Sequence, residues 1–165
     1  MDGRKEIERI EATNNLTSMP ARPWEFDVDL GSNPDEALSR VLAVVREIAK
    51  HVPDAWPSDE KWRAMLPDWL KQHIPQMTKE ETDRLMTTTP RDRWDTLPWE
   101  FGSWLDAVRD RGWRWWGYKQ ADATATFVLH IAMLPERIDA FKQILRAAGI
   151  KIIAERYAAL SSAPI

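Results

Sequence analysis

The sequence predicts an α+β fold in which two helices pack on one antiparallel sheet. The first observation is the alternation in residues 24–30, WEFDVDL, where apolar and acidic side chains fall on opposite faces, as in a half-buried strand. The second is apolar helical periodicity in residues 34–51 and 135–148. The third is a pair of strand-like runs, 113–118 and 123–133, that a short polar turn separates.

A last strand is expected at residues 150–157. Without residues 54–112, the order of elements is β-α-β-β-α-β, the ferredoxin-like split arrangement with a four-stranded antiparallel sheet. The predicted fold is therefore ferredoxin-like α+β with a Trp-rich helical insertion between the first helix and the second strand. A competing layout pairs the same strands differently and makes the helical middle a separate subdomain.

The two covering helices have recognisable ends. Pro34 suits a first helical position, and Asp35 and Glu36 complement the positive end of the helix dipole. In the second helix Pro135 is expected at the start and Gly149 at the C-terminal cap.

The insertion at about 54–112 is expected to consist of several short helices, because prolines recur through it. Thr78 with Glu81 predicts a capped helix over about residues 79–87. A second helix, with Phe101, Trp104, Leu105 and Val108 on its apolar face, is expected to stop at Gly112.

The chain divides into three predicted parts. Residues 1–22 are expected to be a mobile N-terminal arm with a short helix at 4–12, because they show little apolar periodicity. Residues 23–158 form one α+β domain that includes the insertion, and residues 159–165 form a C-terminal tail.

Composition limits the possible functions. The chain has no cysteine, which excludes disulfides, thiol catalysis and thiolate metal sites. It carries a net charge of −3, which argues against a general nucleic-acid binder. It shows no apolar run of signal-peptide or membrane-span type, so we expect a soluble, cytoplasmic protein without a membrane partner.

The segment 111–119, RGWRWWGYK, allows two interpretations. On a strand, Trp113 and Trp115 point to one face while Arg114 and Trp116 point to the other. In the first interpretation these aromatic side chains are covered by the helices, the N-terminal arm or a second subunit. In the second they form a binding surface, whose members are Arg111, Trp113, Arg114, Trp115, Trp116 and Tyr118.

Catalytic motifs and metal-binding spacings are absent from the sequence, and we expect neither catalysis nor a cofactor. The weak catalytic candidates are His130, if it meets Asp27 or Asp29 of a neighbouring strand, and Glu100, which lies between Trp99 and Phe101. The simpler interpretations are a hydrogen-bonded sheet histidine and a carboxylate that serves a helix dipole.

These observations favour a small bacterial-type binding or regulatory protein that contacts a protein partner or forms a homodimer, such as an immunity-like or accessory factor. The second hypothesis is an enzyme or small-molecule binder with a pocket around His130, between the sheet and the Trp-rich helices. The third is a single-stranded nucleic-acid binder that uses the aromatic and basic strand 111–119.

Overall fold

A computed structural model describes residues 2–14 and 16–157 of the chain. Its strands are β1 (Pro23–Asp29), β2 (Trp113–Ala121), β3 (Thr124–Ile131) and β4 (Lys151–Tyr157). Its helices are α1 (Gly3–Glu11), α2 (Pro34–Ala49), α3 (Asp59–Met65), α4 (Asp68–His73), α5 (Lys79–Thr88), α6 (Phe101–Arg109) and α7 (Ile138–Ala147), with short 3-10 segments η1 (Pro53–Ala55) and η2 (Arg91–Thr96). The predicted tail at 159–165 lies outside the described residues.

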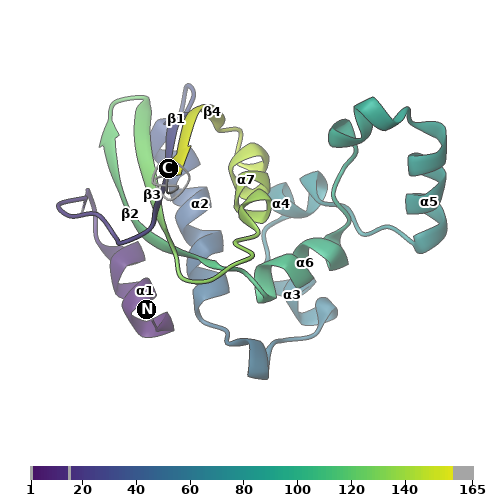
Figure 1. The fold of residues 1–165 in the computed structure, drawn as a ribbon, viewed down its shortest axis with the longest axis horizontal. Coiled ribbons are helices and arrows are strands. Elements are labelled where there is room, and N and C mark those ends of the chain that lie inside the picture. Colours follow the sequence, from purple (N-terminus) through teal and green to yellow (C-terminus); the bar gives the residue numbers. More distant parts are fainter. Residues whose placement is uncertain (1, 15, 158–165) are drawn as a thin grey trace, which may run out of the picture.

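The four strands form one sheet in the order β2-β3-β1-β4, and each neighbouring pair is antiparallel. Helices α2 and α7 lie against one face of this sheet (Figure 1). The predicted α+β class with an open antiparallel sheet is confirmed. The predicted ends of the strands differ from the observed ones by at most about three residues, which is the usual uncertainty of an element boundary.

The core lies between the sheet and these helices. The ring of Phe141 on α7 has its centroid 5.4 Å from that of Phe26 on β1 and 5.3 Å from that of Trp113 on β2. Trp115 contacts Phe127 of β3 at a centroid distance of 5.4 Å, and both tryptophans are fully buried. Each buried indole removes on the order of 200 Å² from water, a gross gain of about 5 kcal/mol before side-chain entropy is subtracted.

The insertion between α2 and β2 is helical, as the prolines predict, and its aromatic residues hold it to α7. Trp62 of α3 and Trp104 of α6 are fully buried, and Trp104 Nε1 donates a hydrogen bond of 3.0 Å to the carbonyl oxygen of Ala140 on α7. The predicted capped helix is α5, in which Thr78 Oγ1 accepts a hydrogen bond of 3.1 Å from the backbone N–H of Glu81.

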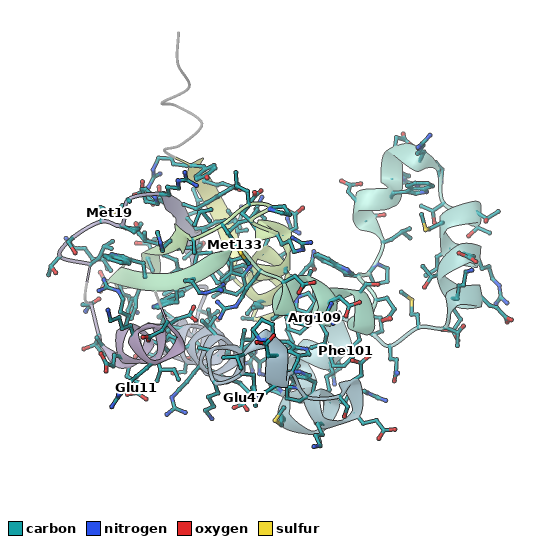
Figure 2. The ribbon with its side chains drawn as sticks, turned by 60° about the horizontal axis from the view of Figure 1, so that its bottom comes forward. Glu11, Met19, Glu47, Phe101, Arg109 and Met133 are labelled. Carbon is teal, nitrogen blue, oxygen red and sulfur yellow. The ribbon has the colours of Figure 1, made fainter. Side chains whose placement is uncertain are left out.

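Helix α5 and segment η2 form a projection, residues 79–96, which we call the finger. None of its residues is buried. In both views the finger stands clear of the sheet and its covering helices (Figures 1 and 2). It is therefore ordered without a hydrophobic core of its own.

Helix α1 covers the outer edge of β2. The carboxylate of Glu6, which is fully buried, accepts hydrogen bonds of 2.8 Å from both terminal nitrogens of Arg111 and one of 2.7 Å from the backbone N–H of Trp115. Arg9 Nε donates to the carbonyl oxygen of Trp116 at 2.6 Å. These side chains occupy backbone groups that a further strand would otherwise use.

Candidate functional site

The sheet face turned away from α2 and α7, which we call the open face, carries most of the polar residues that the sequence singles out. The alternation of side chains along the strands places on it Glu25 and Asp27 of β1, Arg114 and Trp116 of β2, Thr126, Val128 and His130 of β3, and Arg156 of β4. Residues 16–22 lie over part of this face: Trp116 Nε1 donates to the carbonyl oxygen of Ser18 at 2.8 Å, and Ile131 N donates to that of Arg22 at 3.0 Å (Figure 1).

The two candidate carboxylates of β1 are already engaged. Asp27 accepts hydrogen bonds from Arg156, at 2.6 and 3.1 Å, and from the Thr126 hydroxyl at 2.9 Å. The hydrogen bonds from Arg156 hold the pKa of Asp27 below its ordinary value. Asp29 Oδ1 accepts from the backbone N–H of Gly31, which has a φ of +83°. Asp27 therefore forms an ion pair with Arg156, and Asp29 stabilises the turn at Gly31.

His130 does not meet either carboxylate. It lies opposite Pro23 of β1, whereas Asp27 lies opposite Thr126, four residues and about 13 Å further along β3 at roughly 3.3 Å per residue. The Nδ1 atom of His130 is buried and has no hydrogen-bond partner among the described residues. Burial lowers the pKa of this imidazole, and neighbouring positive charges that include Arg114 and Arg22 lower it further.

Glu100 is the N-cap residue of α6. Its carboxylate accepts a hydrogen bond from the backbone N–H of Gly102. This is the helix-terminal role that its position beside the helix start predicts.

The residues of the proposed aromatic surface separate into two groups. Trp113, Trp115 and Tyr118 are buried, so they cannot stack on a ligand from solvent in this structure. Arg111 is buried with Glu6. Trp116 and Arg114 lie on the open face, where the guanidinium carbon of Arg9 is 3.6 Å from the centroid of the Trp116 ring. Trp116 is the only indole of β2 on the open face, and the guanidinium of Arg9 thus covers one face of its ring.

A groove of about 890 Å³ lies between the finger and the helices α4, α6 and α7. Met86 and Trp94 line it from the finger, and Gln143 and Arg146 line it from α7. The indole of Trp94 is held in place because its Nε1 donates to the carbonyl oxygens of Met86, at 3.2 Å, and Thr89, at 3.0 Å. The finger side of the groove is therefore a positioned aromatic and thioether surface.

The other lining residues combine apolar and polar groups. Met77 and Trp99 contribute further apolar surface from the segments that connect the finger to the body. His73 and Gln143 contact each other through Nε2 and Oε1 at 3.1 Å. Arg146 is exposed and has no carboxylate partner among the described residues.

Sequence reasoning missed this groove. The Met and Trp residues of the insertion were the available signal, because exposed thioether and indole groups are typical of contact surfaces. The walls of the groove, however, come from parts of the chain as distant as Met77 and Arg146. No local periodicity in the sequence relates such positions.

Comparisons of the chain with protein-family models, curated proteins and solved structures found no match. Among the described helices, none has the length and apolar character that crossing a bilayer requires. The described part of the chain also brings no three His, Cys, Asp or Glu side chains together as metal ligands.

Proposed function

We propose that this protein binds another protein, and that an amphipathic helix of the partner occupies the groove between the finger and the body. It would then act through contacts, as a binding or regulatory protein. The observation that carries this proposal is the finger itself, in which no residue is buried although its side chains bound a groove of about 890 Å³.

A bound partner is expected to stabilise the finger. A helix as short as the ten residues of α5 is marginal in water without tertiary packing. The side chain of Met86 is 39% exposed, and Trp94 and Trp99 are half-buried. An apolar surface laid between finger and body would bury all three, and adaptable Met side chains and Trp residues often contribute most to such contacts.

The chemistry of the groove indicates what the partner presents. Helix-in-groove recognition uses apolar residues at helical spacing. Arg146, on the body side of the groove, offers a cation without a carboxylate partner among the described residues. Asp95 and Asp139 also line the groove, so the expected partner segment is an amphipathic helix that carries an Asp or Glu only where its apolar face borders Arg146.

We also infer that the sheet and its helices follow the ferredoxin-like arrangement. In its favour, α2 connects β1 to β2, α7 connects β3 to β4, and β1 and β3 are the central neighbours of the sheet. In this arrangement the finger is part of an insertion into an ordinary scaffold, and an immunity-like or accessory role is one form that its docking could take.

The other two hypotheses have less support. An enzyme built on His130 would need a carboxylate hydrogen-bonded to that imidazole, but neither Asp27 nor Asp29 lies beside it, and its Nδ1 atom has no partner among the described residues. A single-stranded nucleic-acid binder lacks the stacked platform, because Trp113, Trp115 and Tyr118 are buried.

The proposal is tested with a synthetic amphipathic peptide of about 16 residues that carries Leu at helical spacing and one Glu beside its apolar face. We expect binding with a Kd on the order of 10 μM by calorimetry, together with a change in Trp fluorescence. Replacing the peptide's Glu with Lys is expected to weaken binding about fivefold, the effect of one exposed ion pair.

Met86→Glu and Met65→Glu form a matched pair of variants. Both methionine side chains are 39% exposed, but Met65 lies on α3 and does not line the groove. We expect Met86→Glu to weaken peptide binding about tenfold or more and Met65→Glu to leave it unchanged. Equal effects of the two substitutions, or failure of the peptide to bind, would contradict the proposal.

A further inference from the structure

One end of the open face brings two arginines and one histidine together from three parts of the chain. Arg114 of β2 and His130 of β3 lie directly opposite each other in the sheet. The carbonyl oxygen of Arg22 accepts the hydrogen bond of Ile131, the residue after His130, so the chain at Arg22 runs beside the end of β3. The charges of Arg114 and Arg22 both lower the pKa of His130, after the larger effect of its burial, which agrees with this arrangement of the chain.

This cluster has no acid of its own among the described residues. Among the described residues, Arg114 donates from Nη1 alone, to the carbonyl oxygens of Arg111 and Trp113 at 3.0 and 2.8 Å. Glu6 exerts a field on Arg114, but its oxygens accept hydrogen bonds from Arg111 and from the backbone of Trp115. The Nε and Nη2 donors of Arg114 and the Nδ1 atom of His130 therefore have no partner in the described part of the chain.

The other half of the open face shows the contrast. There Arg156 donates to Asp27 and to Glu25, so that cation is balanced by two carboxylates. Glu25 lies opposite Val128, two residues from His130, and its charge is directed to Arg156. The face is thus divided into a half where two carboxylates surround one cation, with a formal charge of −1, and a half where Arg114 has no carboxylate hydrogen-bonded to it among the described residues.

Partial burial of the Arg114 charge is energetically unfavourable without a counter-ion. Burial lowers the pKa of Arg114 to about 10, and the nearby charge of Arg111 adds to the effect. A guanidinium remains charged at neutral pH even so, and a partly buried charge without a hydrogen-bonded counter-ion is unfavourable. An oxyanion would remove this penalty and accept the unused N–H groups.

We propose that Arg114, Arg22 and His130 form a binding site for a phosphate group. Donors on separate segments suit a tetrahedral oxyanion, because its acceptor oxygens point in more directions than the two oxygens of a planar carboxylate. The phosphate can be inorganic, part of a phosphorylated side chain, or part of a nucleotide. This site is separate from the finger groove, and its occupancy does not depend on the partner helix.

The test is an NMR titration of the full chain with inorganic phosphate, phosphoserine and adenosine monophosphate, with chloride at equal ionic strength as reference. We expect the imidazole signals of His130 to shift with a Kd of millimolar or tighter. We expect each bound phosphate group to raise the pKa of His130, because an adjacent anion favours the imidazolium. The compound with the tightest binding identifies the source of the phosphate.

Arg114→Gln is expected to weaken phosphate binding at least tenfold, whereas Arg156→Gln on the same face is expected to leave it unchanged. If Arg114→Gln does not fold, Arg22→Gln replaces it, because that side chain is exposed, and it is expected to weaken binding several-fold at an unchanged unfolding midpoint. The proposal is overturned if His130 has the same pKa in phosphate and in chloride, or if the Arg156 variant loses as much affinity as the others.

Discussion

The contact between Glu6 and Arg111 is the most deeply buried ion pair in the described part of the chain. The Glu6 side chain is fully buried and that of Arg111 is 7% exposed. The pair is bidentate, and the remaining acceptor capacity of Glu6 is used by the Trp115 amide. Such a pair is not more stabilising than an apolar contact of the same shape, but removing one partner leaves a buried charge unpaired.

Glu6→Gln is therefore expected to lower the free energy of unfolding by about 3–5 kcal/mol, as measured by urea denaturation. The matched control is Glu11→Gln on the same helix. Glu11 pairs with Arg46 at 2.9 Å, but both side chains are about half exposed, so its loss should cost at most about 1 kcal/mol. Similar losses for both variants would show that Glu6 is not held as the structure describes.

Individual residues also show which features of the structure the sequence does not predict. Alternation correctly places Trp113 and Trp115 on one face and Arg114 and Trp116 on the other. It cannot say which face is covered, because the cover comes from Phe141 and other residues distant in sequence. Glu6 gives no signal at all, since an acid in a polar N-terminal helix is typical of an exposed position.

At the scale of elements, the two edge strands of the sheet are protected from further strand pairing in different ways. The β2 edge is covered by α1, whose Glu6 and Arg9 bond to its backbone. The β4 edge instead carries charged residues and an irregular register between Asp27 and Val28 of its neighbour. Charges and bulges are the usual protection of an edge strand that no other element covers.

The finger is expected to be energetically independent of the sheet, because it contributes no buried residue. Thr78→Ala removes the N-cap of α5 and should destabilise that helix locally by about 1 kcal/mol, seen as faster amide hydrogen exchange in residues 79–88, without moving the global unfolding midpoint.

Ser58→Ala is the corresponding change at the N-cap of α3, where Ser58 accepts from the Lys61 amide at 3.3 Å. Because α3 carries the buried Trp62, this variant should lower global stability by about 1 kcal/mol. A midpoint that falls equally in both variants would mean that the finger unfolds together with the core.

The helices and strands were predictable because each has its own periodicity and end signals, and α5 begins at the residue after Thr78 as its capping signal requires. The start of α7 differs from the prediction. The helix begins at Ile138 rather than at Pro135, because Glu136 accepts a hydrogen bond from Gly112 and Arg137 adopts a left-handed conformation with φ of +54°. A contact between segments that are distant in sequence thus moves the start of α7 away from the position that Pro135 predicts.

At the scale of the molecule, the groove and the phosphate site are both products of tertiary arrangement. The groove needs the finger to stand opposite α7, and the charge imbalance of the open face needs β2 and the chain at Arg22 to meet at β3. Element order predicts the sheet, but it contains no information about where an insertion of this length points. Composition suggested a type of function, which stays a prediction, and it left both surfaces unidentified.

The dependence of whole-molecule stability on pH follows from His130. Its folded-state pKa lies below the ordinary value of 6.5, so the unfolded chain binds more protons between these two values. The free energy of unfolding should therefore fall as pH drops below about 6.5, until His130 is protonated in the folded state as well. Asp27, Glu47 and Asp110 also have lowered pKa values, but as carboxyl groups they contribute below about pH 4.

Urea denaturation between pH 7.5 and 5.0, in chloride buffers without phosphate, isolates this contribution. The His130→Gln variant should lose less stability than the unmodified protein over that interval, because its side chain cannot take up a proton. Adding phosphate should reduce the loss in the unmodified protein, since a bound anion raises the pKa of His130 towards its unfolded value, and should have no such effect on the variant. Identical pH profiles for the two proteins without phosphate would show that His130 titrates as it does in the unfolded chain.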